Sequence, residues 1–128
     1  MKIEIEVKPL SSMRYNTLGD YFYKKDGTLR FEIADTGNDT YNTMILIHEI
    51  IEELMTKVKG INEKKITEFD FKFEKERESG LHGIESEPGF DIRSPYEPEH
   101  MIATAVEMII CAHLGIKWNK YNYDINSL

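Results

Sequence analysis

The chain has 128 residues, a mass of 15.0 kDa and a formal net charge of −7. This length predicts a single domain over residues 1–128, and the acidic charge argues against broad binding to nucleic acid. We see neither a signal-peptide pattern nor an apolar run of about eighteen residues or more, so we expect no membrane partner. The single Cys111 cannot form an intrachain disulfide, which fits the reducing cytoplasm.

Strand patterns dominate residues 1–34. Apolar and charged residues alternate over residues 3–8, which is the pattern of a strand with one buried face. Asp26-Gly27 separates two segments rich in strand-forming residues, and this dipeptide is a strong signal for a hairpin. We therefore predict a small antiparallel sheet in the amino-terminal third of the chain.

Helical periodicity and cap residues predict three helices, over residues 40–59, 62–78 and 98–114. Asp39 or Thr40 is the expected N-cap of the first helix, and Gly60 is expected to end it. Asn62 fits the start of the second helix, and Gly115 fits the end of the third. Four apolar residues of the third helix are expected to pack inward: Ile102, Val106, Ile109 and Ile110.

Three other segments carry weaker patterns. Phenylalanines alternate over residues 69–73 as they do in a strand, but the charged tail that follows without a turn favours a helix. Glycine and proline recur over residues 79–97, which predicts a long loop, either a lid over a site or a surface excursion. Residues 116–128 are expected to form an irregular tail that packs back through three aromatic residues: Trp118, Tyr121 and Tyr123. These elements predict an α+β fold, a small antiparallel N-terminal sheet packed against three helices.

The first helix carries a pattern with chemical meaning, His48-Glu49-Ile50-Ile51-Glu52. Residues four apart share a helix face, so His48 and Glu52 point the same way, into the apolar side, and can hold one metal ion. Burying this pair costs several kcal/mol unless the groups are paired, protonated or coordinated. Glu49 lies beside that face, where the general base of H-E-x-x-H zinc hydrolases lies, although the second motif position here is Glu52.

The other two predicted helices supply candidate partners. Asp70 falls on the face of the second helix that should be buried, and His100 and Glu107 lie about two turns apart in the third. Small Ala103 between them allows a neighbouring helix to approach closely, as a site shared between helices requires. The predicted metal ligands are His48, Glu52, His100 and Asp70, the last as a fourth ligand or as a partner of a ligand. Zinc is the first candidate for such a donor set, and iron or manganese is feasible.

Several residues and short motifs are spread over most of the chain after the first strand: His48-Glu49, Glu52, Phe69-Asp70, Glu87-Pro88-Gly89, Tyr96, Glu99-His100, Glu107 and Trp118. In these residues the chain resembles a family of small uncharacterised proteins carried by tailed phages and prophages. The resemblance implies a phage or prophage context and a location in the cytoplasm of the bacterial host. Strands followed by a helix with His-Glu also resemble the zincin-type metallopeptidases, which implies zinc and a peptide or protein substrate.

Three functions remain open on these grounds. The first is a metal-dependent hydrolase with Glu49 as general base, which holds an extended peptide at a sheet edge. The second is a non-catalytic phage adaptor or inhibitor, in which the same His, Glu and Asp residues form a buried hydrogen-bonded cluster. The third is a magnesium-dependent nucleotide pyrophosphatase, in which the metal would be held by four helical carboxylates: Glu49, Glu52, Glu53 and Glu107. The strand-rich amino terminus fits this class poorly.

Overall fold

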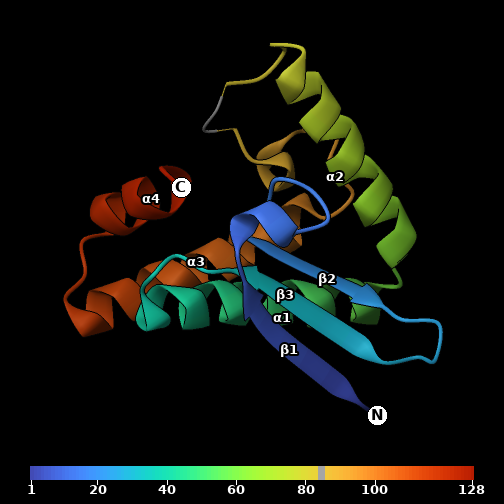
Figure 1. Ribbon diagram of the computed structural model, residues 1–128, viewed down its shortest axis with the longest axis horizontal. Helices are drawn as coiled ribbons and strands as arrows, with labels where there is room; N and C mark the ends of the chain where they lie inside the picture. Colours follow the sequence, from blue (N-terminus) through green and yellow to red (C-terminus); the bar gives the residue numbers. More distant parts are fainter. Residues whose placement is uncertain (84–85) are drawn as a thin grey trace.

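The computed structural model describes residues 1–83 and 86–128 (Figure 1). The strands in this part of the chain are β1 (Ile3–Lys8), β2 (Gly19–Tyr23) and β3 (Leu29–Ala34). The α-helices are α1 (Asp39–Lys59), α2 (Glu63–Glu78), α3 (Glu97–Leu114) and α4 (Trp118–Asn126), and two short 3-10 helices are η1 (Leu10–Ser12) and η2 (Pro88–Phe90). The predicted α+β class is confirmed.

The sheet has the strand order β1-β3-β2. β2 and β3 form the predicted antiparallel hairpin, in which Tyr21 lies opposite Phe31. β1 instead runs parallel to β3, with Ile5 opposite Phe31, so the sheet is mixed and the prediction of a purely antiparallel sheet is wrong for this strand. The link over residues 9–18 carries the chain past the position that β3 later fills. Alternation within a strand specifies a buried face and not a neighbour or a direction, so the sequence pattern could not reveal this.

The ends of α1 follow from capping chemistry. Asn38 is the N-cap, and its side chain accepts a hydrogen bond from the backbone N–H of Tyr41 at 3.1 Å. The prediction of Asp39 or Thr40 was therefore one or two residues late, and Asp39 instead lies in the first turn, where a negative charge is favourable. Gly60 ends the helix in the left-handed conformation with φ 75°, as predicted.

The second and third helices lie close to their predicted bounds. Asn62 caps α2 by accepting a hydrogen bond from the backbone of Lys64 at 2.8 Å, and Gly115 ends α3 with φ 72°. The predicted inward packing of α3 is wrong for Ile102 and Ile109, which are 44% and 68% exposed. The buried face of α3 instead carries small and polar residues: Glu99, His100, Ala103, Glu107 and Cys111.

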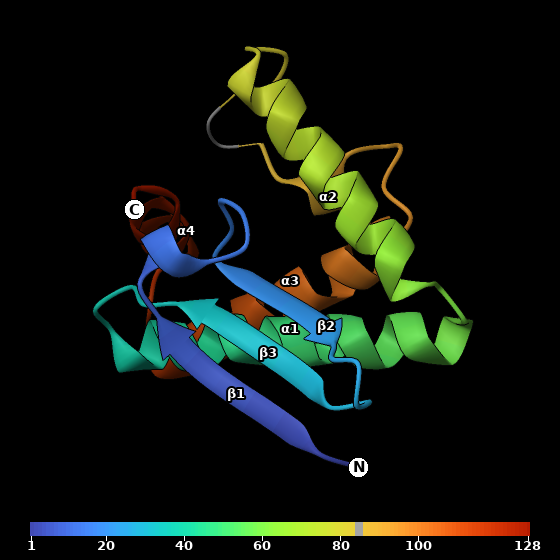
Figure 2. The same ribbon diagram turned by 45° about the vertical axis from the view of Figure 1, so that its right-hand side comes forward.

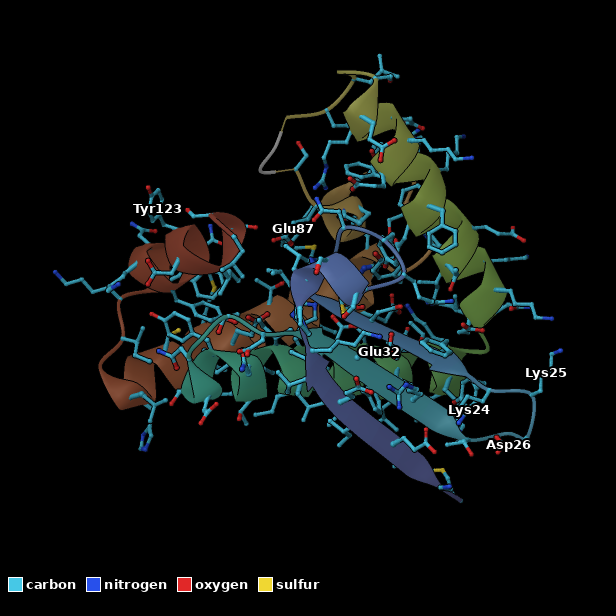
Figure 3. The ribbon with its side chains drawn as sticks, viewed as in Figure 1. Lys24, Lys25, Asp26, Glu32, Glu87 and Tyr123 are labelled. Atoms are coloured by element: carbon cyan, nitrogen blue, oxygen red, sulfur yellow. The ribbon has the colours of Figure 1, made fainter. Side chains whose placement is uncertain are left out.

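The segments predicted to be irregular contain short helices. Within 79–97, η2 packs against both α2 and α3, whereas residues 84–85 of this predicted loop lie outside the described residues. The predicted tail is helix α4, because its apolar positions are spaced three and four apart and bury one face. Tyr121 and Ile125 lie on that face with 0% and 7% exposure, whereas Tyr123 is 72% exposed and points away from the molecule (Figure 3). The prediction that Tyr123 packs back is therefore wrong.

The helices and the sheet enclose a shared interior. Figures 1 and 2 show α1 lying along one face of the sheet with α3 beside it. α2 rises from the C-terminal end of α1, and α4 follows the C-terminal end of α3 on the other side of the molecule. One apolar cluster joins β3, α1, α3 and α4, and a second joins the sheet to α2, with Leu46 in contact with both. Cys111 is 1% exposed in the first cluster, as core packing predicts. No helix among residues 1–83 and 86–128 is long and apolar enough to cross a membrane.

Candidate metal centre

Two helices bring three of the four predicted metal ligands together. His48 and Glu52 lie one turn apart on α1, and His100 projects from the facing first turn of α3. All three side chains are buried, with exposures of 7%, 4% and 8%. Ala103, which is fully buried one turn after His100, lets the helices approach closely, as its small size predicts.

The three side chains converge on one point. Glu52 Oε2 lies 2.7 Å from His48 Nε2 and 2.5 Å from His100 Nδ1, and the two nitrogens are 3.1 Å apart. In a tetrahedral site with metal–ligand bonds of about 2.0–2.1 Å, ligand atoms lie about 3.3 Å from one another. The three atoms therefore form a triangle slightly smaller than one face of such a site. Among the described residues, this group meets the geometric requirement for a metal site.

The outer nitrogen of each imidazole contacts a carboxylate. His48 Nδ1 is hydrogen-bonded to Glu107 Oε1, and His100 Nε2 lies 2.8 Å from Glu87 Oε2. Glu107 also accepts a hydrogen bond from the hydroxyl of Tyr121 on α4. Metal-ligating histidines almost always donate their other N–H to such a partner, which fixes the tautomer and the ring orientation. With those N–H groups turned outward, both inner nitrogens present lone pairs to each other and to Glu52.

This arrangement requires positive charge at its centre. Two lone pairs and a carboxylate oxygen repel one another unless a metal ion or additional protons lie between them. For protons alone, burial opposes the charged form of His100, but contacts with Glu52 and Glu87 outweigh burial and raise its pKa to about 9. Burial likewise opposes a charged His48, yet Glu52 and Glu107 raise its pKa well above the ordinary value. Burial would raise the pKa of Glu52, but the two histidines lower it to about 2.

We therefore expect the metal-free protein to lose stability as the pH rises from 6 to 9. The folded-state pKa values of both histidines lie above the ordinary 6.5, so their stabilising contribution is complete below about pH 6.5. It is lost as the pH passes through the folded-state values, at about 9 for His100. Glu52 affects the stability only under acidic conditions, because its stabilising contribution is lost as the pH falls from about 4.5 to about 2. Urea denaturation in the presence of a chelator should show a loss of the order of a few kcal/mol, whereas a flat profile would contradict these pKa directions.

Glu49, the predicted general base, lies beside His48, Glu52 and His100 and lines a cavity with them. The cavity has a volume of about 220 Å³. Among the described residues, the Glu49 carboxyl has no hydrogen-bond partner, and it packs against the backbone of Gly19 at the start of β2. Burial, reinforced by the charge of Glu52, raises the pKa of Glu49 well above its ordinary value. A carboxyl with a raised pKa inside a cavity is suited to proton transfer near neutral pH.

Asp70 lines the cavity but is not a member of the ligand group. Its Oδ1 accepts a hydrogen bond from Tyr96 at 2.7 Å, and its Oδ2 accepts one from Tyr15 at 3.0 Å. The structure thus brings together three of the four predicted ligands and holds Asp70 apart on the wall formed by α2. Burial raises the pKa of Asp70 to about 7, against the opposing effect of both tyrosine hydroxyls. Helical spacing predicted that this residue is buried, but it cannot specify which neighbour a buried side chain meets.

The sequence pattern did not place Glu87 or Tyr121 in the site, although Tyr121 was expected to pack against the core. Glu87 precedes η2, and Figure 3 shows it between α2 and α4 at the middle of the molecule. Its contact with His100 depends on Gly89, where a Cβ atom would lie 2.5 Å from Nδ1 and 2.6 Å from Cδ2 of His100. Only a residue without a side chain allows η2 to pack this closely. The Pro88-Gly89 dipeptide is the signal in the sequence for this close approach, but by itself it predicts only a loop.

We expect Gly89→Ala to destabilise the protein by about 1–3 kcal/mol, because a packed ring cannot yield to an added methyl group without shifting η2 or α3. Gly83→Ala is the matched control in the same segment, since its Cβ would lie 3.7 Å from Ser86 Oγ, an ordinary contact. Urea denaturation of the two variants measures the difference. Equal stabilities would show that η2 does not pack on His100 as described.

The four carboxylates of the pyrophosphatase hypothesis do not converge. Glu53 is buried with 7% exposure, but it faces the sheet, where its carboxylate accepts a hydrogen bond from the hydroxyl of Tyr23. Glu107 is hydrogen-bonded to His48, and Glu52 lies between the two histidines. The described geometry therefore favours a mixed imidazole and carboxylate site over a cluster of carboxylates alone.

Comparisons with protein-family models, with curated proteins and with solved structures gave no match for this chain. The geometry of the His48, Glu52 and His100 site is therefore the basis for assigning a function.

Proposed function

We propose that the protein is a metal-dependent hydrolase with a zincin-like peptidase activity, encoded by a phage or prophage and active in the host cytoplasm. His48, Glu52 and His100 hold the metal, and zinc is the first candidate ahead of iron or manganese. The proposal rests on one observation. Two imidazole nitrogens and a carboxylate oxygen meet at one point, while the outer nitrogen of each imidazole contacts a carboxylate of its own.

The surrounding side chains have separate tasks in this proposal. When bound, zinc supplies a Lewis acid that polarises a carbonyl group and makes water more acidic. Glu49 takes the proton from the attacking water and passes it to the leaving group, for which a raised pKa is appropriate. Glu107 and Glu87 hold the imidazole rings in one orientation, and Tyr121 in turn positions Glu107.

β2 is an edge strand of the sheet, and its position beside the cavity supports a peptide or protein as the substrate. At one end of the hairpin the backbone N–H of Ala34 donates to the carbonyl of Leu18, and at the other end the N–H of Lys24 donates to the carbonyl of Thr28. Antiparallel pairing alternates, so the backbone groups of Gly19 and Tyr21 face away from β3. The Gly19 carbonyl accepts a hydrogen bond from the hydroxyl of Thr17 at 2.8 Å. Gly19 and Tyr21 also line the cavity beside Glu49. An extended peptide that displaces the Thr17 hydroxyl and pairs with this edge would place its backbone next to the candidate metal site.

Cleavage of a mixed peptide library tests this function. Zinc-loaded protein is incubated with the library, products are identified by mass spectrometry, and a chelator-treated sample and a zinc-restored sample are run in parallel. We expect cleavage that the chelator abolishes and zinc restores. Absence of cleavage by protein that carries stoichiometric zinc would reject the hydrolase and retain only a metal site.

A specific observation favours the non-catalytic alternative. If both imidazoles are doubly protonated, each of their nitrogens has a carboxylate partner, so the cluster is complete without a metal. The raised pKa values of His48 and His100 in the metal-free state are consistent with this form. In that case the cluster fixes the pairing of α1 with α3, and the protein is a phage adaptor or inhibitor. A zinc titration separates the alternatives, because only the metal site binds zinc and releases protons.

A further inference from the structure

The cavity beside the candidate metal centre has an uneven distribution of charge. Its described lining contains six carboxyl side chains and a single lysine or arginine, Arg77. The carboxyl side chains are Asp20, Glu49, Glu52, Asp70, Glu87 and Glu107. Carboxylates remain in excess even with a divalent ion bound and with Arg14 paired to Asp20. An anionic substrate such as a nucleotide would therefore be repelled, whereas a cationic one would be attracted.

Asp70 differs from most of the other carboxylates of this cavity. Asp20 is held by Arg14, and Glu52, Glu87 and Glu107 each contact a histidine. Asp70 is 7% exposed and, within the described chain, its hydrogen-bond partners are two neutral hydroxyl groups. A buried carboxylate without a cation is unfavourable, and each of its oxygens retains a second position for a hydrogen bond. Burial accordingly raises the pKa of Asp70.

The surroundings of Asp70 suit an ammonium group. Tyr15 and Tyr96 each donate a hydrogen bond to one oxygen of the carboxylate, and both residues line the cavity. Aromatic rings beside a carboxylate attract a cation through their faces, and an ammonium group brings three hydrogen-bond donors. Glu49 cannot take this role if it accepts the proton of the attacking water.

We propose that Asp70 is the specificity-determining residue of the cavity and binds a primary ammonium group of a peptide substrate. This inference rests on the proposed hydrolase function and names the substrate class for it. The ammonium group belongs either to the amino terminus of the peptide or to a lysine side chain. This role accounts for a buried carboxylate that lines the cavity without joining the three ligands.

Binding of short peptides tests the proposal without requiring turnover. The zinc-loaded Glu49→Gln variant is titrated calorimetrically with acetyl-Ala-norleucine-Ala-amide and with three relatives. One relative has a free amino terminus, one has lysine in place of norleucine, and one has glutamate there. We expect one of the two cationic peptides to bind at least about tenfold more tightly than the neutral peptide, and the glutamate peptide to bind most weakly. The better cationic peptide identifies the source of the ammonium group.

A second substitution assigns the preference to Asp70. Adding Asp70→Asn should remove the advantage of the cationic peptide while zinc content remains unchanged. Asp20→Asn is the matched control, because it removes one charge from the same cavity but from a carboxylate already occupied by Arg14. Thermal melting confirms that each variant is folded. Equal affinity of the parent for neutral and cationic peptides, no binding of either cationic peptide, or a preference that survives Asp70→Asn would each overturn the proposal. Zinc content and wild-type cleavage, measured separately, test the underlying hydrolase function.

Discussion

The Glu49→Gln variant is expected to hydrolyse peptides about 10²–10⁴-fold more slowly than the wild type, while it binds zinc as before. Glutamine has nearly the same shape as glutamate but cannot accept the proton of the attacking water. Glu49 has no hydrogen-bond partner among the described residues, so the substitution breaks no hydrogen bond in that part of the structure, and the similar shape of glutamine keeps the packing against Gly19. Steady-state kinetics should show a loss in kcat with little change in KM, because the carboxylate acts in the transition state.

Glu53→Gln is the matched control for this experiment. Glu53 belongs to the same helix and is buried, whereas Glu49 is half-buried, but Glu53 contacts Tyr23 on the sheet side and does not line the cavity. Its substitution should leave kcat close to the wild-type value. Unchanged turnover in Glu49→Gln on a substrate that the wild type cleaves would remove the assignment of Glu49 as the base.

The second large effect is expected for His100→Ala, which should weaken zinc binding by more than about 100-fold. Loss of an outer partner of a ligand typically weakens binding by about 10–100-fold, and loss of a ligand has a larger effect. The substitution also leaves Glu52 and Glu87 without their imidazole partner. Competition with a chromophoric chelator measures the affinity, and elemental analysis measures the zinc content.

His113→Ala provides the comparison for His100→Ala. His113 lies in the last turn of the same helix α3 and is exposed to solvent. Its removal should not change the zinc affinity. If His100→Ala bound zinc as tightly as His113→Ala, the ligand set derived from the structure would be incorrect.

The part of the site on α1 could be predicted because it depends on local geometry. A spacing of four residues places His48 and Glu52 on one helix face whatever the fold, and both are buried as expected. Gly60 and Asn62 likewise act through their immediate neighbours. Such features need only one element to be identified correctly.

The third helix shows where hydrophobic patterning failed. Patterning assumes that apolar residues face inward, yet α3 turns His100, Ala103 and Glu107 inward and exposes Ile102 and Ile109. A helix that carries part of a polar site departs from the usual distribution on its buried face. The departure from the pattern is therefore itself a mark of the candidate site.

The remaining contacts of the site depend on the arrangement of distant segments. Glu87 reaches His100 from the segment before η2, and Tyr121 reaches Glu107 from α4. Asp70 faces two tyrosines, one of which precedes β2. The direction of β1 is a similar case, since it depends on the path of residues 9–18. Periodicity predicts which face of an element is buried, but not which other element covers it.

Elemental analysis of wild-type protein purified without a histidine tag tests the central claim most directly. The proposed metal centre predicts about one zinc, iron or manganese ion per chain, retained through gel filtration. After chelator treatment, adding that metal should raise the melting temperature, because binding to the folded state stabilises it. Protein without stoichiometric metal, whose melting temperature does not change with zinc, iron or manganese, would contradict the assignment of a metal centre.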